Sequence, residues 1–177
     1  MTARRTLLQI SLVVLLALGA GLAGAWVWES RWTPVTGVAL HHEFVLDQQG
    51  APADFTATGS YVVWALVFGL LAGLLAGVVT RGRELTTLVV LLVSAGVGGW
   101  LMVQVGQALG PPDPAALAKT LDDFTPMTAD LRVHGVAPLL ALPAGALLGL
   151  AVAYLTEVAF RGVRQPPAPR PATLVTH

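Results

Sequence analysis

The sequence predicts an all-α integral membrane protein, in which a bundle of four transmembrane helices carries a small extracellular cap. The chain has 177 residues, of which 55% are hydrophobic and 11% are charged, whereas soluble domains carry about 25% charged residues. Four apolar runs are each long enough to cross roughly 30 Å of hydrocarbon as a helix. The segments between them are too short for a separate soluble domain, so we expect one membrane domain over residues 1–160.

The first apolar run predicts a span over residues 7–28, behind the basic pair Arg4-Arg5. A cleaved signal peptide is the alternative, because Ala23-Gly24-Ala25 resembles a cleavage site. The run is longer than the apolar region of a signal peptide, which has about 7–15 residues, so we favour an uncleaved anchor. The other runs predict spans over residues 61–80, 85–109 and 136–160, separated by outer loops 29–60 and 110–135.

The distribution of charge predicts how the spans are oriented. Seven of the ten basic residues lie in the two termini and the loop between the second and third spans, and only three lie in the outer loops. Because cytoplasmic loops carry the excess of Lys and Arg, we expect both termini to be cytoplasmic. Five aromatic residues are expected at the outer membrane boundary, as is typical of interface belts: Trp26, Trp28, Trp32, Tyr61 and Trp64.

Composition places the protein in a bacterial plasma membrane as a multi-pass protein. Ala, Gly, Val, Leu and Arg abound while Asn is absent, which is typical of a GC-rich genome. Ten basic and ten acidic residues balance, so net charge offers no support for binding nucleic acid. The chain has no Cys, which excludes disulfides and thiolate-ligated metals. Prolines crowd residues 161–177, so we expect a disordered cytoplasmic tail, with a polyproline recognition segment as the alternative.

The two outer loops predict the cap. Residues 37–46 are β-prone and residues 47–50 are turn formers, which indicates a short hairpin. Asp113 is placed to cap a surface helix that has Pro114 at its first position and runs to about Leu121. The alternating segment 131–133 is expected to pair with the strand of the first loop.

Small residues four positions apart predict where the helices touch, because helix association in lipid relies on close contact at such residues. Chance spacing is the alternative in a chain so rich in Ala and Gly. We also expect Pro143 to kink the fourth span, since its nitrogen cannot donate a helical hydrogen bond. The candidate packing residues of the second and fourth spans are Gly69, Gly73, Gly77, Ala141, Gly145 and Gly149.

Few residues indicate chemistry. Glu157 is the candidate intramembrane ionisable residue, although Arg161 lies one helical turn away and favours a local ion pair. The two outer loops contain residue types that bind divalent metals, and these could form a site if the loops meet. They are His41, His42, Glu43 and Asp47 in the first loop and Asp122, Asp123 and His134 in the second. Adjacent histidines on a strand point to opposite faces, so we predict a solvated acidic surface and no metal site. The candidate partner-binding residues are His41, His42, Glu43, Asp47, Asp122 and Asp123.

No span carries an acid near its centre, and no nucleophile lies beside a base in the sequence pattern. We therefore predict a noncatalytic accessory, assembly or interaction subunit, without a cofactor. Its expected partners are the lipid bilayer and a membrane protein or a second copy of the chain. A small transporter or channel component and a lipid-handling enzyme are the alternatives.

Short landmarks add a resemblance over roughly residues 7–155. The chain resembles a family of four-span actinobacterial membrane proteins that carry a domain of unknown function. The resemblance implies a Gram-positive plasma membrane and brings no catalytic residues. Its landmarks are a basic start, Trp26, Trp28, Pro34, Val38, Asp54-Phe55, Tyr61, Gly110, Leu131, Val133 and Pro143.

Overall fold

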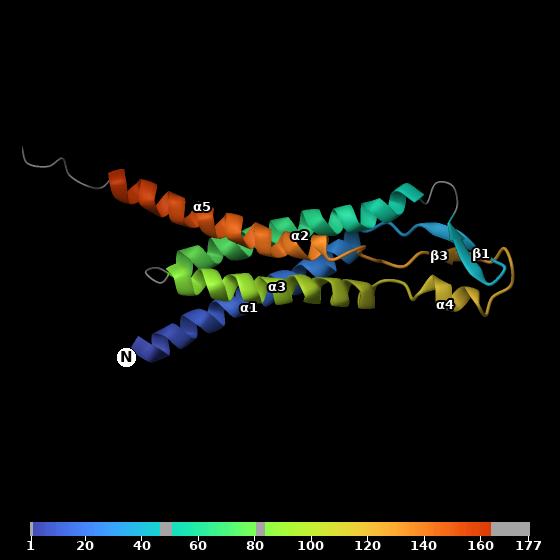
Figure 1. The fold of residues 1–177 in the computed structure, drawn as a ribbon, viewed down its shortest axis with the longest axis horizontal. Coiled ribbons are helices and arrows are strands. Elements are labelled where there is room, and N and C mark those ends of the chain that lie inside the picture. The colour runs from blue at the N-terminus through green and yellow to red at the C-terminus, as the bar shows by residue number, and fades with distance from the viewer. Residues whose placement is uncertain (1, 47–50, 81–83, 164–177) are drawn as a thin grey trace, which may run out of the picture.

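The computed structural model describes residues 2–46, 51–80 and 84–163, and is mostly helical (Figure 1). Its long helices are α1 (Thr2–Arg31), α2 (Ala51–Val79), α3 (Glu84–Leu109) and α5 (Ala141–Val163). All four are long and apolar enough to cross a membrane, which confirms this part of the predicted fold class. The predicted disorder of the tail falls largely on residues 164–177, outside the described residues, and residues 161–163 still belong to α5.

The four helices run along the long axis of the molecule (Figure 1). The N-terminus and the end of α5 lie at one end of the bundle, and the strands and the short helix α4 (Pro114–Ala118) lie at the other. Even numbers of long helices return the chain to its starting end, so this arrangement follows from the count.

Helices α2 and α5 pack backbone against backbone. A Cβ atom at Gly73 would lie 1.9 Å from the carbonyl oxygen of Ala146, and one at Gly149 would lie 2.1 Å from that of Leu70. Such distances leave no room for any side chain at either glycine. The same holds for Gly69, Gly77 and Gly145, each of which would place a Cβ within 2.5 Å of the other helix, while Ala141 is buried nearby.

Helices α1 and α3 form a second close pair. A Cβ at Gly21 would lie 2.3 Å from the carbonyl oxygen of Gly98, and one at Gly98 would lie 2.6 Å from that of Ala17. The bundle is therefore built from two tight pairs. Close approach stabilises each pair because it adds van der Waals contact between the helices.

Two of the aromatic residues expected at the membrane boundary are buried in the core of the bundle. Trp28 and Tyr61 are fully buried, and their rings meet edge to face with centroids 5.2 Å apart. Trp28 Nε1 donates to the carbonyl oxygen of Ala57 and to Ser60 Oγ, each at 3.1 Å, and the Tyr61 hydroxyl donates to Gly99 O at 2.9 Å. Their polar atoms thus find partners on neighbouring helices, whereas the expected level of these residues at the membrane boundary stays a prediction.

Pro143 lies nearer the start of its helix than the predicted span over residues 136–160 implies. A 3₁₀ helix, η1 (Ala137–Leu140), precedes α5, which itself begins at Ala141. Pro143 therefore lies in the first turn, where the backbone nitrogen has no intrahelical acceptor in any case. The chain changes from a 3₁₀ helix to an α-helix two residues ahead of the proline.

Candidate functional site

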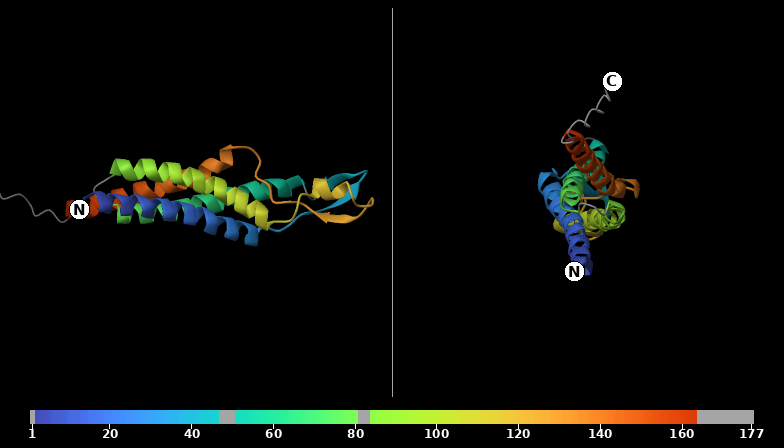
Figure 2. Two further views of the ribbon diagram at one scale, coloured as in Figure 1. Left: turned by 90° about the horizontal axis from the view of Figure 1, so that it is seen from below. Right: turned by 90° about the vertical axis from the view of Figure 1, so that its left-hand side faces the viewer.

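The two long connections fold together into one unit, which we call the loop module. It contains α4 and three strands, β1 (Thr36–Leu40), β2 (Glu43–Leu46) and β3 (Pro126–Thr128). The strand order is β2-β1-β3, with both neighbours antiparallel to β1. Figure 2 shows the module beyond the ends of α1 and α3, so residues of both connections meet there.

The hairpin turns earlier than the sequence predicts. His41 and His42 link β1 to β2 and have φ values of 51° and 65°. Two positive φ values are what a two-residue type I′ hairpin turn requires. The histidines therefore lie in a turn, and the expectation that they alternate on a strand was wrong. Asp47 and the predicted turn over residues 47–50 lie outside the described residues.

The third strand also differs from the prediction. Residues 126–128 pair with β1, whereas residues 131–133, which alternate in polarity, form no strand. The predicted cap of α4 is confirmed, since Asp113 Oδ1 accepts from the backbone nitrogen of Ala115 at 3.0 Å and Pro114 is the first residue. The helix ends at Ala118, before the expected Leu121, and Ala118 packs against Ala39 in a small core.

Candidate residues of the two connections meet at the far end of the module. The His41 backbone nitrogen donates to Asp123 Oδ1 at 2.8 Å, and His41 Nδ1 lies 3.9 Å from Asp123 Oδ2. Phe124 follows directly, with 74% of the residue exposed and a φ of 64°. Its backbone nitrogen donates to Ala39 O at 2.7 Å, which holds it against β1. We call His41, Asp122, Asp123 and Phe124 the tip surface.

The other candidates, His42 and Glu43, line a cavity of about 440 Å³ between the module and the helix ends. We call it the junction cavity. Trp32 and Ala57 line it from the side of α1 and α2, so it lies where the module meets the bundle. The structure thus divides the predicted partner-binding set, with His41, Asp122 and Asp123 at the tip and His42 and Glu43 in the cavity. Its other charged or imidazole lining residues are Asp113, Lys119, Asp130, Arg132 and His134.

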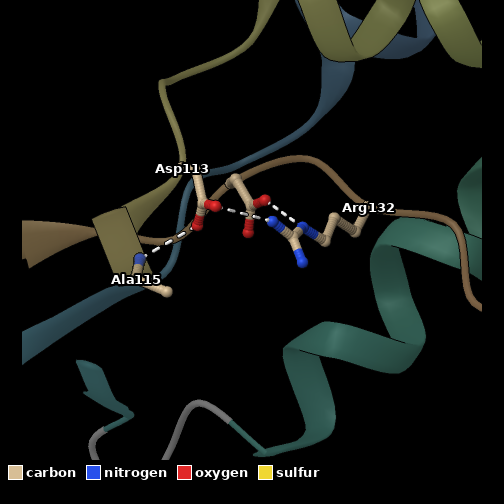
Figure 3. A network of polar contacts seen from close by, with 4 residues as sticks. Asp113, Ala115 and Arg132 are labelled. Carbon is tan, nitrogen blue, oxygen red and sulfur yellow. Dashed lines mark hydrogen bonds and ion pairs between the residues drawn. The ribbon is translucent and has the colours of Figure 1, made fainter. Parts of the chain in front are cut away.

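Arg132 forms an ion-pair network with two carboxylates (Figure 3). All three residues of the network line the junction cavity. Arg132 Nη2 lies 3.2 Å from Asp113 Oδ2, and Arg132 Nε donates to the carboxylate of Asp130. The hydrogen bond and charge of Asp130, followed by the charge of Asp113, raise the pKa of Arg132 above its usual range. A second cavity of about 360 Å³ shares these three residues. The network ties the segment after β3 to the start of α4.

Neither the metal ligands nor the intramembrane acid form a chemical centre in the described part. No group of three or more His, Asp and Glu side chains there is arranged to hold a metal ion. Glu157 is half-buried in the last third of α5. The predicted ion pair with Arg161 lies outside the described side chains.

Sequence reasoning missed Phe124, Lys119 and the Arg132 network. A left-handed backbone at a phenylalanine has no signal in sequence, because bulky residues rarely adopt it. The pairing of Arg132 with Asp113 depends on the fold of the module and not on local spacing.

No family model matches the chain, and neither the curated proteins nor the solved structures contain a match. The resemblance to four-span actinobacterial proteins therefore stays a prediction.

Proposed function

We propose that this protein is a noncatalytic subunit of a bacterial plasma-membrane complex, which binds a partner protein through the tip surface. The observation that carries the proposal is the exposed Phe124, held next to Asp122 and Asp123 at the end of a folded module. Two connections far apart in sequence build this surface together, so its shape is defined by tertiary structure. Rigidly positioned loops are where proteins commonly place recognition.

The backbone conformation of Phe124 is unfavourable for the stability of the fold. A left-handed backbone at a non-glycine residue costs on the order of 1–3 kcal/mol. The exposed ring buries little apolar surface in return, although the backbone bonds to Ala39 hold its position. Large aromatic residues are frequent energetic anchors of protein interfaces. An interface that covers the ring would therefore explain why the protein keeps a costly backbone conformation and an exposed aromatic ring at Phe124.

The membrane placement is part of the same proposal. Large apolar side chains stand exposed along the bundle, including Leu15, Val93 and Leu155, each more than 60% exposed. Such a continuous apolar surface is stable when lipid covers it. Seven of the ten basic residues lie in the two terminal segments and in the connection between α2 and α3, so the positive-inside rule favours cytoplasmic termini and an outer module.

Charge and lining residues favour binding over catalysis. Among the described residues of the tip surface and the junction cavity, no serine, threonine or cysteine lies where an adjacent base would activate it. The two outer loops hold eight acidic and three basic residues. A partner with a basic face around an apolar pocket fits the acidic surroundings of Phe124, since opposite charges steer association.

The test compares two apolar residues of the module. Phe124→Gly removes the ring and relieves the left-handed backbone, so the variant should stay folded. Leu117→Ala, on the exposed side of α4, is the matched control. Proteins captured from cells after cross-linking and solubilisation are quantified by mass spectrometry for each variant. We expect Phe124→Gly to lose a specific partner about tenfold or more while Leu117→Ala retains it.

Equal capture by Phe124→Gly and by the unaltered chain would contradict the proposal. If Phe124→Gly loses only the capture of a second copy of this chain, the partner is that second copy and the protein is a homo-oligomer. Thermal unfolding of each purified variant in detergent shows whether the fold is retained.

A further inference from the structure

We propose that the junction cavity binds a zwitterionic ligand that carries a phosphate and a primary amine, supplied by the headgroup of an aminophospholipid. The site goes beyond the proposed function, because no residue of the tip surface lines this cavity. Its volume of about 440 Å³ falls within the roughly 300–1,000 Å³ that is typical of small-molecule sites.

Two of the residues that line this cavity, Glu43 and Lys119, carry unlike charges. Within the described part of the chain, neither side chain forms an ion pair or a hydrogen bond, and they do not pair with each other. A ligand that brings an ammonium to Glu43 and a phosphate to Lys119 would neutralise both at once. Charge-assisted bonds of this kind are the strong ones.

The remaining charges favour a ligand with no net charge. Arg132 is already neutralised, since Asp113 and Asp130 both contact its guanidinium. Three carboxylates and two cations line the cavity when the imidazoles are neutral. This excess of negative charge would repel a purely anionic ligand, whereas a zwitterion has no net charge to be repelled.

Neutral groups complete the chemistry. The imidazoles of His42 and His134 line the cavity, and an imidazole N–H is a suitable donor to a phosphate oxygen. The aromatic residues Trp32 and Phe44 are also among its lining residues. Such rings attract an ammonium group through the negative potential of their faces.

The location of the cavity selects a lipid as the source. Trp32 directly follows α1, and Ala57 lies at the start of the apolar window of α2, Thr56–Val79. In the membrane placement proposed above, this level is where the hydrocarbon ends and the phosphates and amines of the lipid lie. This step rests on the proposed placement, whereas the charge arrangement does not.

The experiment uses the full-length protein, stripped of lipid in a maltoside detergent. It is titrated with phosphatidylethanolamine or phosphatidylglycerol of equal acyl chains, and with soluble phosphoethanolamine, and binding is read by native mass spectrometry. We expect phosphatidylethanolamine to bind about tenfold more tightly than phosphatidylglycerol, as loss of one charged contact would predict. Soluble phosphoethanolamine that binds as tightly as the lipid would identify a soluble ligand of the same chemistry as the source.

Variants locate the site. Glu43→Gln and Lys119→Gln should each weaken phosphatidylethanolamine binding about tenfold, and Glu43→Gln should also abolish the preference over phosphatidylglycerol. Glu43→Asp and Lys119→Arg retain the charges and should retain binding. Glu84→Gln, at the start of α3 and away from the cavity, should bind phosphatidylethanolamine as the unaltered chain does. Equal binding of the two lipids by the unaltered protein, or unchanged binding by both Gln variants, would overturn the proposal. Partner capture through Phe124 would be unaffected by either result.

Discussion

The tyrosines Tyr61 and Tyr154 differ in whether the hydroxyl has a hydrogen-bond partner. Tyr61 is fully buried and donates to the carbonyl oxygen of Gly99 on α3. The Tyr154 hydroxyl is buried without a partner in the described part of the chain. Removing a satisfied hydroxyl loses a bond, whereas removing an unsatisfied one relieves a desolvation cost.

We therefore predict that Tyr61→Phe lowers the free energy of unfolding by about 1 kcal/mol and that Tyr154→Phe leaves it unchanged or raises it. Denaturant unfolding of the two variants in the same detergent measures the difference. The opposite order of stability would show that the interhelical bond of Tyr61 contributes nothing.

Single residues also show where prediction from sequence stops. The cap of α4 at Asp113 was predictable, because capping depends on residues next to each other in the chain. The turn at His41 and His42 was not, because histidine is a less common turn residue than the Asp, Gln and Gly that follow. Glu43 and Lys119 line the same cavity only because of the fold of the module, so the spacing of residues in the sequence could not predict it.

At the scale of elements, glycines of the long helices differ in whether a neighbouring helix contacts them, as Gly73 on α2 and Gly96 on α3 show. A Cβ at Gly73 would meet the backbone of α5 at 1.9 Å, whereas one at Gly96 on α3 would meet nothing within 4 Å. Both glycines lie within long helices. Alanine has a higher helix propensity than glycine at either position, so the two substitutions differ only in whether the added Cβ meets another helix.

We predict that Gly73→Ala destabilises the protein by about 1–3 kcal/mol because the helices must separate, while Gly96→Ala stabilises it by up to about 1 kcal/mol. Thermal unfolding in detergent is the measurement. A Gly73→Ala variant as stable as Gly96→Ala would mean that α2 and α5 do not touch at this glycine in the protein.

The long helices were the most predictable elements, because a run of apolar residues is a local property of the chain. Their ends were less so, since α2 begins at Ala51, ten residues ahead of the predicted span at Tyr61. That early part is more polar and lies outside the hydropathy signal. Strand β3 has only three residues and contains Pro126, so its pairing depends on β1 and not on its own pattern.

The whole molecule is polarised along its axis (Figure 2). The loop module, with the tip surface and the junction cavity, lies at one end, and the start of α1 and the end of α5 lie at the other. The sequence predicts the same polarity in its charges, since the loops hold eight of the ten acids. Both the proposed partner and the proposed lipid depend on this module facing outward.

The most direct test of the account is the side of the membrane on which the module lies. The chain has no native cysteine, so single-cysteine variants can be labelled cleanly. Ala116→Cys lies on the exposed side of α4, and Thr2→Cys and Thr173→Cys mark the two termini. We predict that an impermeant maleimide added to intact cells labels Ala116→Cys, and labels the terminal variants only after lysis. Labelling of both termini in intact cells, with Ala116→Cys protected, would contradict the account.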